Sequence, residues 1–413
     1  MKVLLIHPKF SYRGKDLFPL GLGYLAGIAE GHNISVIDEN ITPFDITKIK
    51  NDLDIIGISS TTPSFSRAME IVKEIKEFRS DLIIVMGGTH VTFSHEEALK
   101  GGVDIIVTGE GEYSFLEILE GKEIDKIKGL VYMNKNKIIK TLNRELIHDL
   151  DSVPFPAWNY FPINKYGIMS LITSRGCPYS CAYCSAAKFW KNQVRYRSPE
   201  NVIDELNLIS DLGFKLIRFM DSTFTLEKKH CLKICELIKE ERLDLKWSCE
   251  TRADAIDKDI LKSFVKSGCN LICIGIGTGS QQILDGINRR IRASTIANAF
   301  DKIRKYGIST RAYVTFGFPG EQEKSVVETL NFLKKVNPDQ ILLSLATAYP
   351  GNKFWGENFV EIHPDWVSKF QGHGLGGKLY LANSLSRKDY IKLADFMWNE
   401  VRRISKGKSQ VIN

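Results

Sequence analysis

The chain has 413 residues, of which 43% are hydrophobic and 25% are charged, and its formal net charge is +7. At roughly 150 residues per domain, this length predicts two globular domains and an appendage. Because the charge is modest and both signs are interspersed, no nucleic-acid partner is expected. No stretch approaches the ~18 to 20 continuous apolar residues that cross a bilayer, and the first residues are typical of a strand and not of a signal peptide, so no membrane partner is expected.

All eight cysteines lie at or beyond position 177. A secreted protein that is stapled by disulfides is usually small and spreads its cysteines through the chain. We therefore expect reduced thiols and a cytoplasmic location. Three of the thiols fall within the short segment 177–184, which singles out this segment as a candidate site.

The first 125 residues alternate short apolar runs with amphipathic segments, one of which, 66–78, has helical spacing. Because the runs are apolar on both faces, they predict an α/β domain with a doubly wound, Rossmann-like parallel sheet. The five expected strands are residues 3–7, 34–37, 55–59, 82–86 and 105–108.

In such a sheet, ligands bind at the carboxyl ends of the strands, where this chain has small and polar loops. The residues expected to contact a ligand there are Ser59, Ser60, Thr61, Gly87, Gly88, His90, Gly109, Glu110 and Gly111. The earlier segment 21–27 misses the dinucleotide pattern G-x-G-x-x-G by one position and lies well after its strand. Close packing of a helix is the better explanation of its glycines.

A turn-rich segment, residues 126–165, is expected to form a small hairpin and a linker. Strand and helix patterns then alternate again, which predicts a partial (β/α)6 barrel over residues 166–350 with its active site at the carboxyl ends of the strands. Residues 351–413 are expected to form a small, mainly helical C-terminal region. The expected barrel strands are residues 170–173, 216–219, 245–248, 271–274, 311–315 and 340–344.

Directly after the first barrel strand, Cys177, Cys181 and Cys184 have the spacing C-x3-C-x2-C. A cubane iron–sulfur cluster normally takes four thiolate ligands, so three in one loop leave one iron open to another ligand. Structural zinc would need four Cys or His ligands, and no fourth is nearby. The spacing therefore favours a catalytic [4Fe-4S] cluster over zinc or over three structural thiols.

With the aromatic Tyr183 before the third cysteine, this loop resembles the radical S-adenosylmethionine superfamily. The resemblance implies that S-adenosylmethionine chelates the open iron and is cleaved to a 5'-deoxyadenosyl radical. It also implies the residues that contact this cofactor at successive strand ends, and for Arg252 a bidentate pair with the cofactor carboxylate is physically sensible. They are Tyr183, Asp221, Ser222, Thr251, Arg252, Gly277 and Gly317.

One position departs from the pattern of this superfamily. Many members read G-I-E-S-G after the fourth strand, whereas this chain has Gly277 where the acidic residue stands. We therefore expect the contacts to the ribose or to the substrate to be rearranged here.

The N-terminal domain, followed by a hairpin and the segment 150–156, resembles the cobalamin-binding subgroup, which includes the class B methyltransferases. A methylthiotransferase would carry a second cluster on N-terminal cysteines, and the chain has none before Cys177. The pattern D-x-H-x-x-G, which places a histidine on cobalt, is also absent. We therefore expect the cobalamin to bind with its own base displaced, and His90 to act through hydrogen bonds.

The resemblance implies a cobalamin-dependent methylation of an unactivated carbon, or of phosphorus, through methylcobalamin and the 5'-deoxyadenosyl radical. The substrate would be a small molecule or a peptide, and an external donor such as flavodoxin or ferredoxin would supply electrons. Two alternatives stay open. One is a cobalamin-dependent ring-forming or rearrangement enzyme without methyl transfer, and the other is a corrinoid or iron–sulfur sensor.

Overall fold

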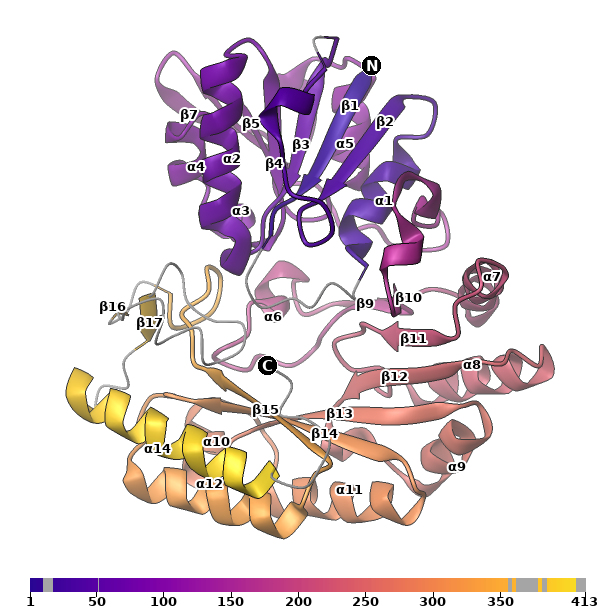
Figure 1. The fold of residues 1–413 in the computed structure, drawn as a ribbon, viewed down its shortest axis with the longest axis vertical. Helices are drawn as coiled ribbons and strands as arrows, with labels where there is room; N and C mark the ends of the chain where they lie inside the picture. Colours follow the sequence, from indigo (N-terminus) through magenta and orange to yellow (C-terminus); the bar gives the residue numbers. More distant parts are fainter. Residues whose placement is uncertain (10–17, 51, 356–358, 362–377, 381–384, 406–413) are drawn as a thin grey trace. The chain divides into compact units, whose positions relative to one another are not determined.

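The computed structural model describes all residues except 10–17, 51, 356–358, 362–377, 381–384 and 406–413 (Figure 1). The chain divides into two compact units, Met1–Gly167 and Ile168–Asn413. Within the described residues, no helix combines the length and the apolar character that crossing a membrane requires.

The first unit is built on a seven-stranded sheet with the order β2-β1-β3-β4-β5-β6-β7. Its first five strands are parallel, which confirms the expected doubly wound sheet. The expected hairpin adds to the same sheet, because β6 pairs with β5 and buries Leu130 and Val131. The strands are β1 (Lys2–His7), β2 (Asn33–Asp38), β3 (Ile55–Ser59), β4 (Ile83–Gly87), β5 (Ile105–Val107), β6 (Leu130–Asn134) and β7 (Lys137–Lys140).

Helices cover both faces of this sheet (Figure 1). The apolar side of α2 packs in one core with alternate residues of the central strands, such as Ile56 and Ile84. On the other face, a side chain at Gly57 would meet Phe115 of α5. The helices are α1 (Leu20–Ile28), α2 (Phe65–Phe78), α3 (Thr89–Phe93), α4 (Glu96–Lys100) and α5 (Glu112–Leu119), and short 3-10 turns lie at Ile46–Lys48, Thr62–Ser64, Ile124–Lys126, Trp158–Tyr160 and Ile163–Lys165.

The glycines of α1 permit a close approach by the segment that follows the hairpin. A Cβ at Gly27 would overlap the carbonyl oxygen of Phe155, and one at Gly23 would lie 2.8 Å from the Cβ of Pro156. The backbone N–H of Ala157 donates to the carbonyl of Gly23 at 3.0 Å. Close packing is therefore confirmed as the reason for Gly23 and Gly27, whereas a Cβ at Gly21 would meet no atom within 4 Å.

The second unit contains a six-stranded sheet with the order β15-β14-β13-β12-β11-β8, in which every neighbouring pair is parallel. This arrangement confirms the expected partial barrel. Its strands are β8 (Met169–Leu171), β11 (Leu216–Phe219), β12 (Lys246–Thr251), β13 (Cys269–Gly277), β14 (Ser309–Phe316) and β15 (Gln340–Leu345). Two short pairs accompany them, β9 (Ser174–Gly176) with β10 (Val194–Tyr196), and β16 (Phe359–Glu361) with β17 (Lys378–Tyr380).

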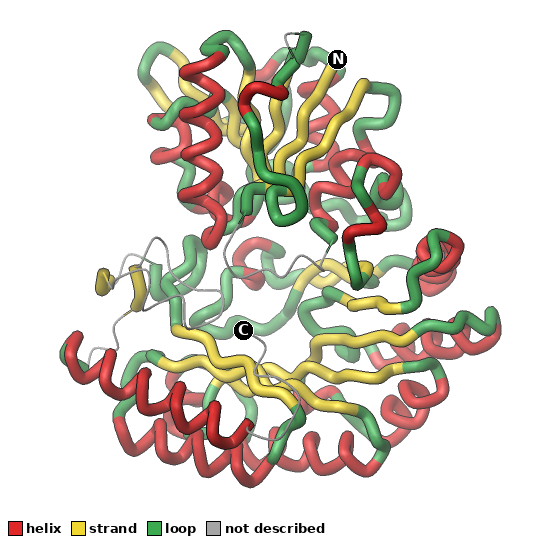
Figure 2. Tube along the Cα trace, in the orientation of Figure 1, coloured by secondary structure: helices red, strands yellow, loops and turns green. Residues whose placement is uncertain are grey.

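In Figure 2 the helices α8, α9, α11, α12 and α14 of this unit lie along one face of the curved sheet. A cluster of aromatic rings fills the space between that face and α9, where Trp247 packs against Phe264 with ring centroids 4.7 Å apart. The helices are α6 (Ala186–Phe189), α7 (Pro199–Asp211), α8 (Lys228–Glu240), α9 (Lys258–Lys266), α10 (Gln281–Gly286), α11 (Ala293–Lys305), α12 (Glu323–Val336) and α14 (Arg387–Ser405), with a 3-10 turn at Ala253–Ala255. Parts of the expected C-terminal region, including 362–377, lie outside the described residues.

Candidate active site

The cysteine loop begins where β9 pairs with β10 in an antiparallel register. Gly176, the last residue of β9, has a φ of 118°, and a Cβ there would overlap the carbonyl oxygen of Gln193. Only glycine fits this close approach, since L side chains rarely adopt such a φ. The chain therefore turns sharply into Cys177.

Two other segments of the second unit hold the loop by hydrogen bonds. The N–H of Ala182 donates to the carbonyl of Ile287 at 2.9 Å, and the amide of Asn288 donates to the carbonyl of Ser180 at 2.8 Å. On the other side, the amide of Asn352 donates to the carbonyl of Tyr183 at 3.0 Å. The loop is thus fixed by residues that lie more than 100 positions away in sequence.

The three thiols of this loop are free, with Cys181 buried and Cys177 and Cys184 partly exposed. Burial raises the pKa of Cys177 and of Cys184, the charges of neighbouring thiols raise both further, and the guanidinium of Arg289 opposes these effects. Among the described residues, no three His, Cys, Asp or Glu side chains are arranged to hold a metal ion. The thiols therefore share one loop without forming a finished ligand set, and their role as cluster ligands stays a prediction.

The donor chemistry of the loop nevertheless fits an iron–sulfur cluster. Thiolates are the ligands such clusters take, and a buried cation lies beside one of them, because Arg289 Nη1 donates to Cys181 Sγ at 3.6 Å. Sequence reasoning missed Arg289. The only signal was its place in a turn rich in arginine, and only the fold shows which of these arginines turns inward.

Arg252 is buried beside the cysteine loop, with its guanidinium 3.8 Å from the centroid of the Tyr179 ring. It forms a bidentate pair with Asp254, at 2.9 and 2.7 Å. A cofactor carboxylate would have to compete with this pair. The expected contact of Arg252 with S-adenosylmethionine stays a prediction.

Asp221 lies at the entry to the loop, and only 1% of it is exposed. Its carboxylate accepts hydrogen bonds from the N–H and the hydroxyl of Thr173 and from the hydroxyl of Ser174, and burial raises its pKa. In the structure it therefore orients the segment that leads into Cys177. Ser222 beside it is exposed, and the predicted cofactor contacts of both residues stay untested.

Gly277 ends β13 after a shift in the register between β13 and β14, and its φ is 76°. A side chain there would have a strained backbone, although the nearest atom to a Cβ is 3.8 Å away. In this structure, the backbone at that position therefore favours glycine over an acidic residue. The hydroxyl of Thr251, another predicted cofactor contact, lies 2.5 Å from that of Thr225.

Gly317 also has a positive φ, 98°, and a Cβ there would lie 2.6 Å from the hydroxyl of Tyr390. The carboxylate of Glu321 accepts hydrogen bonds from two backbone N–H groups, that of Gly317 at 2.5 Å and that of Phe318 at 3.1 Å. Burial raises the pKa of Glu321 to about 7. The ring of Phe318 packs 5.2 Å from that of Tyr183, so two of the predicted positions, Tyr183 and Gly317, are brought near one another.

The strands carry a polar cluster on the side opposite to the buried aromatic rings. Arg218 of β11 donates to the carboxylate of Glu250 on β12 at 2.5 Å and to the hydroxyl of Tyr313 on β14 at 2.9 Å. The side chains of Arg218 and Glu250 are 23% and 33% exposed. The three side chains therefore link β11, β12 and β14 across one face of the sheet, at a position that solvent reaches.

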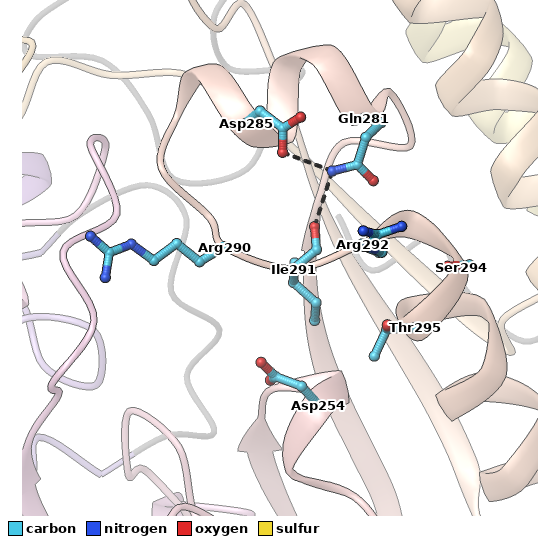
Figure 3. Close-up of a pocket in the computed structure, with 8 residues that line it drawn as sticks. All are labelled: Asp254, Gln281, Asp285, Arg290, Ile291, Arg292, Ser294 and Thr295. Atoms are coloured by element: carbon cyan, nitrogen blue, oxygen red, sulfur yellow. Dashed lines mark hydrogen bonds between the residues drawn. The ribbon is translucent and has the colours of Figure 1, made fainter.

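A pocket of about 900 Å³ lies beside the turn that carries Arg289 (Figure 3). Gln281 bridges it, since its amide donates to Asp285 and to the carbonyl of Ile291. Arg290 points away from this bridge in Figure 3. The residues that line the pocket are Asp254, Gln281, Asp285, Arg290, Ile291, Arg292, Ser294 and Thr295, and the sequence alone singled out none of them.

In the first unit, the loops after β3 and β4 are joined at Ser60. Its N–H donates to the carbonyl of Gly87 at 2.7 Å, and a Cβ at Gly88, which has a φ of 112°, would overlap its carbonyl oxygen. The hydroxyl of Ser60 is buried and has no hydrogen-bond partner among the described residues. An unsatisfied buried hydroxyl between backbone amides fits a cofactor with many amide groups, such as cobalamin. Ser59, Thr61 and Gly87 are partly exposed beside it.

His90 is only 2% exposed. Its Nδ1 lies 3.1 Å from the hydroxyl of Thr62, and its ring stacks on Phe65 with centroids 4.0 Å apart. Burial lowers its pKa to about 4, so the ring is neutral near pH 7. The geometry agrees with a hydrogen-bonding role.

The third predicted loop, which contains Gly109, Glu110 and Gly111, is held by hydrogen bonds to two other segments of the first unit. The N–H of Gly109 donates to the hydroxyl of Thr92 at 3.0 Å, and the buried carboxylate of Glu110 accepts from the N–H of Ile147 at 2.8 Å. Gly109 and Gly111 are partly exposed. The fold therefore brings all three predicted loops to the carboxyl ends of β3, β4 and β5, while the contacts with cobalamin stay predictions.

Two family models match the chain. Residues 10–119 match the B12 binding domain, and residues 171–333 match the Radical SAM superfamily. S-adenosylmethionine, a [4Fe-4S] cluster and cobalamin are therefore its cofactors.

Relatives and a solved structure agree over most of the chain. A protein of Pyrococcus horikoshii described as an uncharacterized methyltransferase is 35% identical over 86% of this chain and 82% of its own length. The anaerobic magnesium-protoporphyrin IX monomethyl ester cyclase of Rubrivivax gelatinosus is 28% identical over 86% of this chain and 70% of its own. The radical S-adenosylmethionine methyltransferase TsrM of Kitasatospora setae, solved with cobalamin and a [4Fe-4S] cluster, shares the fold with a TM-score of 0.79 and 16% identity, over 100% of this chain and 93% of its own. The chain belongs to the family of cobalamin-binding radical S-adenosylmethionine enzymes.

Proposed function

We propose that the protein is a cobalamin-dependent methyltransferase that acts on an unactivated carbon, or on phosphorus, of a small molecule. The observation that carries this proposal is the similarity to a protein described as an uncharacterized methyltransferase, which the match covers over 82% of that protein's length. A TM-score of 0.79 to a chain that holds both cofactors supports the same two-unit architecture.

Cys177, Cys181 and Cys184 would hold the cluster, and the loops around Ser60, Gly88 and Gly109 would hold cobalamin. When these groups are bound, the reduced cluster with S-adenosylmethionine supplies a radical that removes hydrogen, and cobalamin supplies a methyl group. We assign the contacts with S-adenosylmethionine to the strand ends, at Tyr183, Asp221, Ser222, Thr251, Arg252, Gly277 and Gly317.

The chain itself positions the cobalamin and the substrate. The glycine loops of the first unit leave room for a corrin ring to approach the backbone, because no atom lies within 4 Å of the position that a Cβ would take at Gly109. The cluster of Arg218, Glu250 and Tyr313 offers a cation, a carboxylate and a hydroxyl to a polar substrate. Holding the substrate in one orientation restricts the radical to one hydrogen atom.

We further propose that an external donor such as flavodoxin or ferredoxin reduces the cluster, and that the protein acts in the cytoplasm without a nucleic-acid or membrane partner. A peptide is the second class of substrate. The similarity to a cyclase favours ring formation as the second candidate reaction.

The test uses the reconstituted full chain under anaerobic conditions, with a reductant and S-adenosylmethionine deuterated in its methyl group. A methyltransferase will form S-adenosylhomocysteine, and the cobalamin extracted from the protein will gain the mass of one trideuterated methyl group. Formation of 5'-deoxyadenosine with no methyl on cobalamin would favour ring formation or rearrangement. If S-adenosylmethionine is not consumed at all, the sensor alternative holds.

A further inference from the structure

Arg289 lies in the turn after α10 with its side chain directed inward. Only 9% of it is exposed. Its Nη1 donates to Cys181 Sγ at 3.6 Å, and its Nη2 donates to the carbonyl of Gly275 at 2.6 Å. The guanidinium thus joins the cysteine loop to β13.

Several contacts build this position. The turn places Asn288 and Arg290 at positive φ values of 53° and 51°, on both sides of Arg289. The carbonyl of Arg289 accepts from both terminal nitrogens of Arg252 at 3.3 Å. A Cβ at Gly275 would lie 3.0 Å from Nη2, so a larger residue there would crowd the guanidinium.

A buried guanidinium needs an anion. Among the described residues, no carboxylate lies within ion-pair distance of Arg289, and its Nε has no hydrogen-bond partner. Burial of an unpaired charge is costly, and hydrogen bonds to neutral groups offset only part of the cost. The sulfur of Cys181, when it is a thiolate, is the anion that the geometry offers.

We propose that Arg289 is a positioning residue of the iron–sulfur site, which balances the charge of the Cys181 thiolate and raises the reduction potential of the cluster. This inference rests on the proposed role of Cys181 as a cluster ligand. The reduced cluster carries one more negative charge than the oxidised cluster, so a fixed cation stabilises the reduced form more. Hydrogen bonds to the sulfurs act on the potential in the same direction.

The experiment measures the midpoint potential of the cluster by redox titration, followed by electron paramagnetic resonance, in the reconstituted full chain. Arg289→Gln keeps a hydrogen-bond donor but removes the charge, and we expect it to weaken reduction at least tenfold, which lowers the potential of a one-electron couple by about 59 mV or more. Arg289→Lys keeps the charge and should retain most of the wild-type potential.

Arg290→Gln is the matched control, because it removes the same charge from the next residue, which is exposed. We expect it to leave the potential unchanged. An equal shift in Arg290→Gln and Arg289→Gln, or no shift in Arg289→Gln, would overturn the proposal.

Loss of the cluster in an Arg289 variant is an outcome separate from a shift in its potential. If far-ultraviolet circular dichroism shows a folded protein, loss in Arg289→Gln with retention in Arg289→Lys supports charge compensation, whereas loss in both contradicts it. The variant with Ala at positions 177, 181 and 184 tests the ligands separately. Retention of iron there would refute the proposed cluster site, and with it the role of Arg289, whereas loss of iron there with an unchanged potential in Arg289→Gln would refute the role of Arg289 alone.

Discussion

At the scale of single residues, burial of His90 has a consequence for the stability of the first unit at low pH. Its pKa is lowered to about 4 by burial, whereas the unfolded value is about 6.5. Between these pH values the unfolded chain binds a proton that the folded chain does not. The contribution of His90 to the free energy of unfolding is therefore fully present above pH ~6.5. The free energy of unfolding falls by roughly 3 kcal/mol as the pH drops to ~4.

The prediction is that His90→Gln, which keeps a hydrogen-bonding side chain but does not titrate, lacks this component. Hydrogen exchange of the amides of β3 and β4 measures it, as the opening free energy against pH. Identical pH profiles of variant and wild type would show that water reaches the ring. The electron paramagnetic resonance spectrum of bound cob(II)alamin provides the control, since a nitrogen coupling lost in the variant would make His90 a cobalt ligand.

At the scale of elements, α7 is tied to the first barrel strand by a buried ion pair. Arg197 pairs with Glu205 of α7, and the exposures of their side chains are 4% and 0%. The same guanidinium donates to the carbonyl of Ile172 at 2.9 Å, just after β8. The pair therefore orients the helix against the strand that leads into the cysteine loop.

We predict that Glu205→Leu lowers the free energy of unfolding by about 3 to 5 kcal/mol, because it removes the carboxylate of a buried ion pair while the charge of Arg197 stays buried. Glu200→Gln, in the exposed first turn of the same helix, should change it by less than about 0.5 kcal/mol. Urea unfolding of the full chain measures both. A loss for Glu205→Leu as small as that of the control would mean that the pair adds nothing to the packing of α7.

At the scale of the whole molecule, the two units divide at Gly167. The segment before this point packs on the first unit, since the ring of Phe18 lies 4.4 Å from that of Trp158 and 5.4 Å from that of Tyr166. The hydroxyl of Tyr166 also donates to Asp38 at 3.0 Å.

A fragment of residues 168–413 should therefore fold, bind iron and lack cobalamin. A fragment that starts at residue 126 should be less soluble, because it carries the hairpin β6–β7 without its partner β5 and exposes the buried Val131. Iron analysis, cobalamin absorbance and size-exclusion chromatography compare both with the full chain. Binding of cobalamin by 168–413 at the level of the full chain would refute the assignment of cobalamin to the first unit.

The sequence by itself determined the fold class and the order of the units. Strands buried on both faces are read directly from apolar runs, which is why all eleven expected strands lie at β1 to β5, β8 and β11 to β15. The cysteine spacing pointed to the cluster because its predicted ligands are neighbours in sequence.

Only the tertiary structure decided which side chains surround those neighbours. Arg289 reaches Cys181 across 108 positions, and Arg252 is already paired with Asp254. Such contacts follow from the path of the backbone, including the positive φ values around Arg289, and no local pattern encodes that path. The hairpin joined the first sheet for the same physical reason, since burial of Leu130 and Val131 depends on the free edge of β5, which exists only once the sheet has formed.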